Sequence, residues 1–258
     1  MFWPVRHDPQ IGEILWQRLL LDYPFLTKRS AADLAKLRSL SNRFLASKQF
    51  AGAQGLMIDD YCGAAIAAQA CLPVLHLGLH WYDDFEQIIV YPDQFRVRAS
   101  EADELGLVHE SDEFLAGQTI ASGPVILSWA DVRDCQPGFA FNVVIHEFAH
   151  KLDLRDGEAD GCPPLPRAAR RAWRAALHNA YDEFVKLCDE AYDGLPPTLD
   201  PDSDAAAPFL RHLPLDPYAA QDHAEFFAVC AEVIFTDPVL IEKSFPVFYH
   251  RLKEFFKS

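Results

Sequence analysis

The sequence has little positive charge for its size, since 23 lysines and arginines stand against 38 aspartates and glutamates in 258 residues. The formal net charge is therefore −15 at pH 7. An acidic chain is repelled by the phosphates of nucleic acids and by anionic membrane surfaces. We therefore expect neither nucleic acid nor a membrane as a direct partner, and we interpret the acidity as a contribution to solubility.

Paired cysteines and a leader pattern are also missing. The six cysteines follow one another at irregular intervals, and none belongs to a C-x-x-C motif. A disulfide framework is therefore not expected, and reduced thiols in a cytoplasm fit better. The first residues, MFWPVRHDPQIGEILW, contain no basic segment followed by an apolar run and small residues, so we expect no secretory signal. Both absences predict a cytoplasmic protein.

Long hydrophobic runs are scarce, and no internal repeat is visible. One uncharged stretch long enough to span a bilayer covers residues 61–79. It contains Gln69, Pro73 and His76, and acidic rather than basic residues flank it. We interpret it as a buried helix that runs into a loop or a strand, and we expect no membrane span.

The predicted secondary structure changes near residue 81. Residues 12–80 are expected to be mainly helical, with one amphipathic helix after a Ser30 cap and another over residues 59–70. After residue 81, β-branched and aromatic residues predict short strands in QIIVYPDQFRVR and over residues 125–129. We expect an α+β fold, mainly helical, in which an N-terminal helical region (1–80) packs on the core formed by residues 81–258, within one compact domain.

The remaining elements are predicted to be helical. One helix is expected from about Phe139 to Leu154, with Gly157 as its stop. A long amphipathic helix begins near Pro166, and residues 193–217 form a loop or a partly ordered excursion. YAAQDHAEFFAVCAEVIF is expected to be helical again. The tail FPVFYHRLKEFFKS spaces its apolar residues as a helical packing face, or alternatively as a partner-binding helix.

The segment FNVVIHEFAHKLDLRDG contains His146, Glu147 and His150 in the pattern H-E-x-x-H. Residues four apart on a helix point the same way, so both imidazoles can reach one metal ion with nitrogens about 2.0 Å from it. Glu147 is rotated by about 100° and lies beside the ion. There a carboxylate can take a proton from a water molecule and pass it to a leaving amine, so the spacing predicts a metal-hydrolase centre.

A purely structural interpretation competes with this one, because both histidines could be core residues bonded to carbonyl groups. Burying two bare imidazoles and a glutamate on one helix without a shared ligand costs free energy, which favours the metal. Zinc is the expected ion, since two imidazoles, a carboxylate and a water molecule are a common catalytic zinc shell. By ligand type alone, manganese and iron fit as well.

The motif supplies only two ligands, and six residues past His150 stands Asp156 rather than a third histidine. Glu225, on the downstream helix, is our main candidate for the third ligand. Tyr218 lies two turns earlier on the same predicted face, where a phenol can hydrogen-bond an oxyanion. Glu225 can also be explained as the last residue of a capping box in DHAE. Further candidates for the third ligand are Glu232, Asp153, Asp156 and His223.

Two segments, VVIHEFAHKLDLRDGEADGCP and DPYAAQDHAEFFAVCAEVIFTDP, resemble the Mlc titration factor A family of zinc metallopeptidases. The segments IIVYPDQF, GPVILSWADV and FPVFYHRLKEF look like it too, so the resemblance covers roughly residues 10–255. The arrangement is also similar to the catalytic domain of anthrax lethal factor. The resemblance implies a zincin-like metallopeptidase fold with the small β-sheet beside the H-E-x-x-H helix.

The resemblance also implies roles for individual residues. His146, His150 and Glu225 would bind one Zn²⁺ ion per chain, Glu147 would act as the base and Tyr218 would assist catalysis. Members of the family are cytoplasmic, show aminopeptidase activity on small substrates and, in enterobacteria, bind the glucose repressor Mlc. One departure is the segment 193–217, which is longer than the family leads us to expect.

Two functional hypotheses follow. The first is a zinc-dependent, aminopeptidase-like metallopeptidase that acts on a peptide substrate and also binds an Mlc-like transcriptional repressor. The second is a regulatory protein-binding module whose zinc site is vestigial or serves as a switch. The strand at residues 125–129 is either an edge strand on which an extended peptide pairs or a part of the core.

Overall fold

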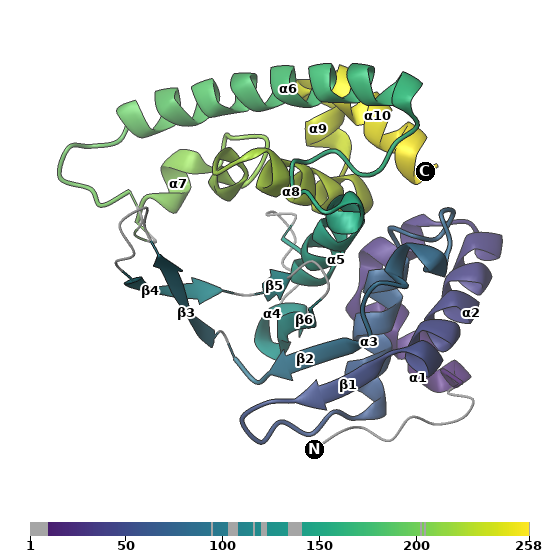
Figure 1. The fold of residues 1–258 in the computed structure, drawn as a ribbon. Coiled ribbons are helices and arrows are strands. Elements are labelled where there is room, and N and C mark those ends of the chain that lie inside the picture. The colour runs from purple at the N-terminus through teal and green to yellow at the C-terminus, as the bar shows by residue number, and fades with distance from the viewer. Residues whose placement is uncertain are drawn as a thin grey trace.

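The computed structural model describes residues 10–93, 95–102, 108–115, 117–119, 123–133, 141–201, 203 and 205–257, with the backbone alone between 95 and 119. Figure 1 shows a β-sheet on one side of the molecule, the helix α5 (Val143–Asp153) next to it, and further helices on the far side of α5. These outer helices include α6 (Arg167–Asp193), α8 (His223–Thr236) and α10 (Pro246–Phe256).

The main sheet has the strand order β1–β2–β6–β5. Its strands are β1 (Gln49–Gly52), β2 (Gln87–Tyr91), β6 (Val125–Ser128) and β5 (Gly117–Thr119). The pairs β1/β2 and β2/β6 are parallel, whereas β5 runs antiparallel to β6. A separate antiparallel pair is formed by β3 (Phe95–Ala102) and β4 (Val108–Leu115). The structure thus confirms an α+β fold with a small sheet, and it confirms the strands predicted in QIIVY and near residue 125.

The strand β6 lies inside the sheet rather than at its edge. It is hydrogen-bonded to β2 on one side and to β5 on the other, and Val125 and Leu127 are fully buried. The interpretation of residues 125–129 as an edge strand that receives a substrate is therefore wrong, and the core interpretation is confirmed. Trp129 already begins the short helix α4 (Trp129–Arg133).

Among the residues that the structure describes, the N-terminal region contributes three α-helices and one strand. The helices are α1 (Glu13–Asp22), α2 (Ala31–Ser47) and α3 (Asp60–Cys71). Ser30 caps α2 by accepting a hydrogen bond from the Asp33 N–H, as predicted. The helix α3 is almost entirely buried, which confirms a buried helix in residues 61–79. The strand β1 was not predicted, because QFAG has too few apolar residues for a strand pattern; pairing with β2 stabilises it. The division at residue 80 stays a prediction.

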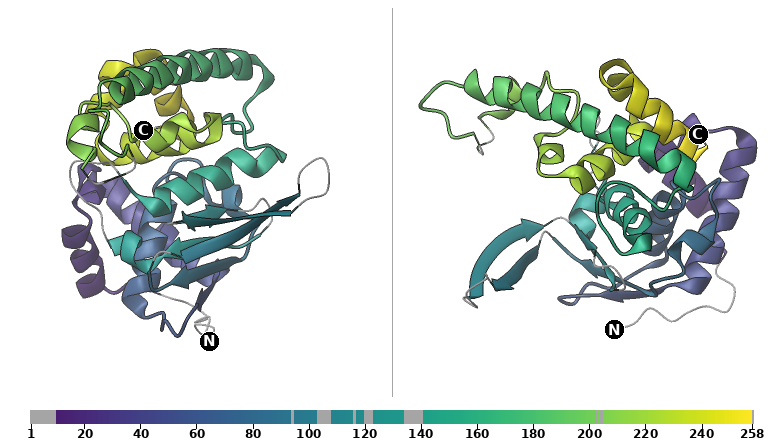
Figure 2. Two further views of the ribbon diagram at one scale, coloured as in Figure 1. Left: turned by 90° about the vertical axis from the view of Figure 1, so that its left-hand side faces the viewer. Right: turned by 45° about the horizontal axis from the view of Figure 1, so that its top comes forward.

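The helix α5 is buried along its whole length and contacts α3, α8, β5 and β6 (Figures 1 and 2). Its predicted end is confirmed: a short 3₁₀ turn, η3 (Leu154–Asp156), leads to Gly157 in the left-handed region. The predicted start at Phe139 lies outside the described residues, and the described helix begins after an Asn142 cap. A helix buried on all sides requires polar partners for every charged side chain it carries.

The outer helices pack through aromatic residues. Trp173 of α6 contacts Phe248 and Phe255 of α10, with ring centroids 5.4 and 5.6 Å apart. The tail helix thus buries the face predicted for packing, which leaves that face unavailable to a partner. In the described part of the segment 193–217, the short helix α7 (Ala207–Leu210) lies between irregular stretches. Among the residues described, we find no helix with the length and apolarity needed to cross a membrane.

Candidate metal centre

The helix that carries the motif is anchored at its first turn. The side-chain oxygen of Asn142 accepts a hydrogen bond from the Ile145 N–H at 2.9 Å and thereby caps α5. The amide nitrogen of Asn142 donates to Oε1 of Gln69 on α3 at 2.7 Å, and both residues are buried. This hydrogen bond ties the start of α5 to α3, so that the first histidine, one turn further on, has a defined position.

His146 and His150 of α5 come together with Glu225 of α8. The Nε2 atoms of the two histidines are 3.1 Å apart. Oε2 of Glu225 lies 3.0 Å from Nε2 of His146 and 3.4 Å from Nε2 of His150. The helices α5 and α8 pack against each other, which brings residues that are far apart in the sequence to one point (Figure 1).

These three atoms fit a metal ion. A tetrahedral zinc ion with bonds of about 2.0–2.1 Å separates its ligand atoms by roughly 3.3 Å, which is close to the three distances in the structure. Oε2 of Glu225 is buried and makes no hydrogen bond of normal geometry, although two ring nitrogens face it. Two imidazole nitrogens that face each other need a proton or a cation between them. The three residues can therefore hold a metal ion.

The charge states of the same groups agree with this interpretation. Burial lowers the pKa of His146, but the carboxylates of Glu225 and Glu232 beside its ring outweigh burial and raise that pKa well above its usual value. Burial raises the pKa of Glu225, but the nearby imidazoles of His146 and His150 outweigh burial and hold that pKa well below its usual value. Glu225 is therefore a carboxylate, and the cluster attracts a positive charge that a metal ion can supply in place of a proton.

Glu232 lies behind His146 rather than at the metal position. Its Oε1 is 2.7 Å from Nδ1 of His146, and its second oxygen accepts a hydrogen bond from the backbone N–H of Asn142. Glu232 is only 3% exposed. A carboxylate in this position fixes the ring orientation of a ligating histidine and selects the tautomer whose Nε2 faces the metal. The Glu232 carboxylate thus contacts Nδ1 of His146 and the backbone of Asn142, whereas the Glu225 carboxylate faces the Nε2 atoms of both histidines.

The remaining candidates for the third ligand, Asp153, Asp156 and His223, have contacts other than the two motif histidines. Asp153 accepts a hydrogen bond from the Gly161 N–H at 2.8 Å, and burial raises its pKa to about 7. Asp156 pairs with Arg170 at 3.9 Å. The His223 ring packs against the rings of His178 and Tyr181 in tilted contacts, with centroid distances of 4.4 Å to both. In the described part of the chain, the three-residue metal cluster consists of His146, His150 and Glu225.

Of the two residues in the predicted capping box, Asp222 acts as a cap and Glu225 does not. Asp222 caps α8 by accepting hydrogen bonds from the N–H groups of Ala224 and Glu225, at 2.8 and 2.9 Å. The carboxylate of Glu225 itself points to the histidines instead of returning to the cap residue. Because the cap fixes the first turn of α8, it also fixes the place from which Glu225 reaches the site.

Tyr218 reaches the site by a route that differs from the prediction. It lies in a separate 3₁₀ turn, η4 (Pro217–Ala220), and not on α8. The prediction of one continuous helix from Tyr218 to Phe235 is therefore wrong. The extended backbone of Asp222 separates the turn from the helix. The Tyr218 ring is nevertheless 6.0 Å from the His146 ring and 44% exposed. Glu147, next to His146 on α5, is buried.

A glycine after α5 determines how closely three helices approach one another. Gly161 has a φ of +72°, and a Cβ atom there would lie 2.4 Å from the backbone oxygen of His223 at the start of α8. Its N–H donates to Asp153, and its carbonyl accepts a hydrogen bond from the indole of Trp173 on α6 at 2.8 Å. The loop therefore links the end of α5 and the first turns of α6 to the start of α8, close in sequence to His150 and Glu225.

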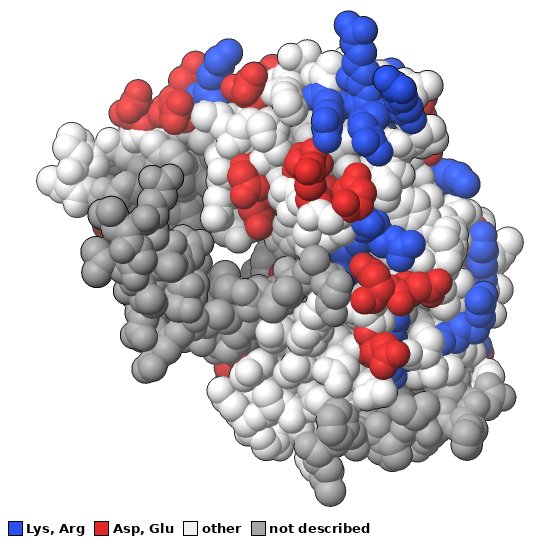
Figure 3. Space-filling model, in the orientation of Figure 1, with Lys and Arg blue, Asp and Glu red and all other residues white. Residues whose placement is uncertain are grey.

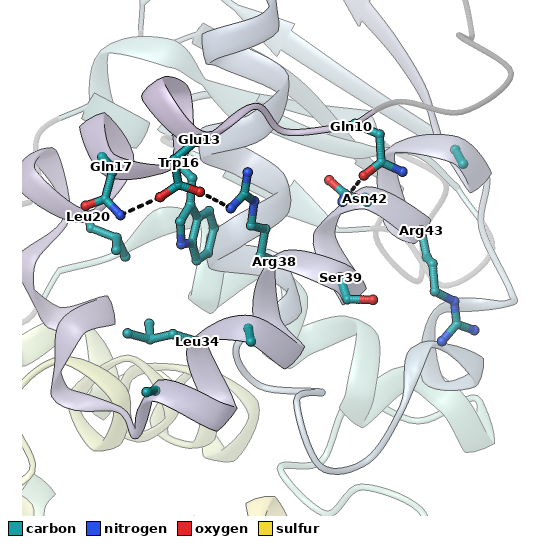
Figure 4. A pocket seen from close by; sticks show the side chains of 13 residues that line it. Gln10, Glu13, Trp16, Gln17, Leu20, Leu34, Arg38, Ser39, Asn42 and Arg43 are labelled. Atoms are coloured by element: carbon teal, nitrogen blue, oxygen red, sulfur yellow. Dashed lines mark hydrogen bonds and ion pairs between the residues drawn. The ribbon is translucent and has the colours of Figure 1, made fainter.

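A groove at another place on the molecule does not contribute to this centre. It lies between α1 and α2, has a volume of about 670 Å³ and is lined by Trp16, Leu34 and other residues of the two helices (Figure 4). Glu13 bridges across it, since it pairs with Arg38 and accepts a hydrogen bond from Gln17. None of the residues predicted for the metal site lines it.

The fold and the site together define the class of protein. A helix with H-E-x-x-H beside a small sheet, completed by a glutamate from a second helix, is the arrangement of a zincin-like metallopeptidase. Comparison with known sequences is more specific. A family model described as "Glucose-regulated metallo-peptidase M90" matches residues 4–257, and the chain belongs to this family.

Individual relatives support the same assignment. The chain is 35% identical over 261 residues to Mlc titration factor A of Salmonella arizonae, which covers 99% of this chain and 95% of that protein. It is 36% identical over 263 residues to Mlc titration factor A of Klebsiella pneumoniae strain 342, covering 99% and 91%. These matches confirm the resemblance to the Mlc titration factor A family along nearly the whole chain.

The role of Glu232 was missed by the sequence reasoning, although the sequence held a signal. Glu232 is the single charged residue in the apolar run FFAVCAEVIF. A lone carboxylate on a buried helix face requires a hydrogen-bonding partner, and the nearest predicted polar cluster was the histidine pair. Asn142 and Gln69 carried no comparable signal, because single amides are common in helices and caps.

Proposed function

We propose that this chain is a zinc-dependent metallopeptidase in which His146, His150 and Glu225 hold one Zn²⁺ ion. The observation that carries the proposal is the convergence of two Nε2 atoms and one carboxylate oxygen at mutual distances of 3.0 to 3.4 Å in a buried place. Two imidazoles and one carboxylate leave one tetrahedral position open, as a catalytic zinc site requires. Membership in a metallopeptidase family supports the same conclusion.

Each residue has a separate task in this proposal. A bound zinc ion polarises a peptide carbonyl and makes a water molecule more acidic. Glu147 accepts a proton from the attacking water and donates it to the leaving amine. The Tyr218 hydroxyl donates a hydrogen bond to the carbonyl oxygen as negative charge develops on it. Glu232 keeps the His146 ring oriented through the hydrogen bond at Nδ1.

The two catalytic roles are tested by conservative substitutions. Glu147→Gln should lower kcat on a peptide substrate by about 10²–10⁴-fold with zinc still bound, because the amide cannot accept the proton. Tyr218→Phe should lower kcat by about 10²–10³-fold with little change in KM, because one oxyanion donor is removed. Wild-type turnover by zinc-loaded Glu147→Gln would rule out the mechanism, and unchanged turnover by Tyr218→Phe would remove the tyrosine from it.

We further propose aminopeptidase-like activity on small peptides, as the family resemblance implies. The assay compares a peptide that has a free amino terminus with the same peptide acetylated at that terminus. Preferential cleavage of the free peptide supports an aminopeptidase. Equal rates on both would instead indicate an endopeptidase with the same zinc chemistry.

A second function rests on the names of the relatives. Because proteins 35–36% identical to this chain are called Mlc titration factor A, we propose that an Mlc-like transcriptional repressor is a partner. Binding of the purified repressor to wild-type chain and to Glu147→Gln separates the two functions. Equal binding by both proteins, together with lost hydrolysis in the variant, supports a regulatory role that does not need catalysis. Absence of binding by the wild-type chain rejects the partner.

The proposed location is the cytoplasm. The five cysteines within the described residues, Cys62, Cys71, Cys162, Cys188 and Cys230, are free thiols and buried. Cys135 lies outside the described residues. Buried thiols without disulfides suit a reducing compartment. Fractionation of cells that produce the chain should recover it with cytoplasmic markers.

A further inference from the structure

The long outer helix α6 separates its charges into two halves. Its first eight residues, RAARRAWR, contain four arginines and no acidic residue, whereas DEFVKLCDEAYD at its end contains five acidic residues and one lysine. Figure 3 shows the acidic half at the upper left and a basic cluster at the upper right. The helix dipole favours the opposite distribution, and charges in different halves cannot form pairs three or four residues apart. The segregation therefore weakens the isolated helix.

Four charged side chains of α6, two at each end, form a line that faces away from the protein, and Asp182 lies on the same line near its middle. At 100° per residue, Arg167, Arg171, Asp189 and Asp193 lie within about 40° of one line along the helix. All four are exposed, whereas the opposite face, which includes Trp173, packs on the aromatic residues of α8 and α10. In Figures 1 and 2, α6 is the outermost element on its side.

Two of the four arginines in the first turns of α6 form ion pairs within the chain. Arg170 and Arg174 pair with Asp156 and Asp160, at 3.9 and 2.6 Å. The side chains of Arg167, Arg171 and the two aspartates of the line form no hydrogen bond or ion pair with the residues that the structure describes. Two unpaired cations at one end and two unpaired anions at the opposite end are therefore available to a partner.

We propose that α6 is a self-association surface, on which the α6 helices of two copies of this chain pair antiparallel. A two-fold axis through the middle of the helix, at Ala180, sets Arg167 opposite Asp193 of the second copy and Arg171 opposite Asp189. Each pair then occurs twice. At 1.5 Å per residue, Arg171 and Asp189 are about 27 Å apart in one helix, so the two groups of pairs lie on either side of the axis.

A second copy fits this surface better than another polyanion does. An acidic peptide or a nucleic acid would satisfy the arginines but would be repelled by the acidic half of α6. A second copy satisfies both halves at once. Exposed ion pairs contribute little each, and one helix face is small for an interface, so we expect a weak dimer that salt dissociates.

Sedimentation equilibrium of the full chain tests the surface. The wild type should approach dimer mass at low ionic strength and monomer mass at about 0.5 M salt. Arg171→Glu and Asp189→Arg should each weaken the dimer by at least about tenfold, because each reverses both copies of a pair. The double variant should regain the dimer, since the charges are exchanged. Arg43→Glu, the same charge change on α2, away from this surface, should behave like the wild type.

Circular dichroism shows whether each variant is folded, so a loss of dimer cannot be confused with a loss of structure. A wild type that stays monomeric at low ionic strength over a concentration series overturns the proposal. A double variant that is as weak as the single variants does the same. Monomeric protein that binds poly-glutamate through the arginine line would assign this face to acidic partners instead.

Discussion

Substitution of Glu232 tests how the metal site is oriented. The carboxylate lies 2.7 Å from Nδ1 of His146, accepts a hydrogen bond from the backbone N–H of Asn142 and is 3% exposed. Glu232→Gln keeps the volume but leaves one acceptor oxygen for two donors, so that one N–H faces the new amide group. The His146 ring then either loses the acceptor that selects its tautomer or shares the one remaining oxygen with the backbone N–H of Asn142.

The expected effect follows from these contacts. Loss of such a partner lowers metal affinity by about 10–100-fold, which corresponds to about 1.4–2.7 kcal/mol of binding free energy. Glu232→Ala should bind zinc more weakly still, because neither oxygen remains. It should also reduce the free energy of unfolding by about 1–3 kcal/mol, since the buried Asn142 N–H loses the hydrogen bond to Glu232.

Zinc affinity is measured by competition with a chromogenic chelator, and denaturant unfolding of the zinc-free chain is measured in parallel. The matched control is Glu242→Gln on the exposed side of α9 (Val239–Ser244), which should equal the wild type in both assays. If folded Glu232→Gln bound zinc as tightly as the wild type, the reasoning about His146 orientation would be refuted.

Two further predictions concern packing and pH. Gly161→Ala should lower the free energy of unfolding by about 2–4 kcal/mol in denaturant titrations, because the added Cβ meets the His223 carbonyl. Gly157→Ala, which has open space around the added Cβ, should lower it by about 1–2 kcal/mol. Equal losses in the two variants would contradict the close contact at Gly161. The raised pKa of His146 stabilises the zinc-free chain fully below about pH 6.5, and this stabilisation is lost as the pH rises toward the folded-state value. Melting temperatures of the zinc-free chain should therefore fall as the pH rises above about 6.5, and they should fall less in His146→Gln. Zinc affinity should rise over the same pH range, because zinc competes with that proton. A melting temperature and a zinc affinity that change in the same direction would contradict this reasoning.

The local part of the site could be predicted from the sequence, because helical geometry alone brings His146 and His150 to one side. The third ligand depends on how α5 and α8 pack, and spacing left Glu225, Glu232 and others open. The prediction for Tyr218 shows the same limit. It came from helical periodicity, yet the backbone is not helical at Asp222, and the tyrosine reaches the site from a separate turn.

The fold could be predicted where local signals were strong. The Ser30 cap, the Gly157 stop and the apolar face of α10 each marked an element that the structure contains. The strand β1 was missed because its stability comes from pairing with β2. For β6, an edge position and a core position both stayed open, because sequence does not report how many neighbours a strand has. Partners distant in the sequence decide both features.

The central claim is that Glu225 completes a zinc site with the two motif histidines. Metal analysis of purified Glu225→Ala by mass spectrometry, beside the wild type, tests it most directly. We predict one zinc ion per chain in the wild type and well under one in the variant, with the fold retained by circular dichroism. A folded Glu225→Ala chain that keeps one full equivalent of zinc would contradict the account.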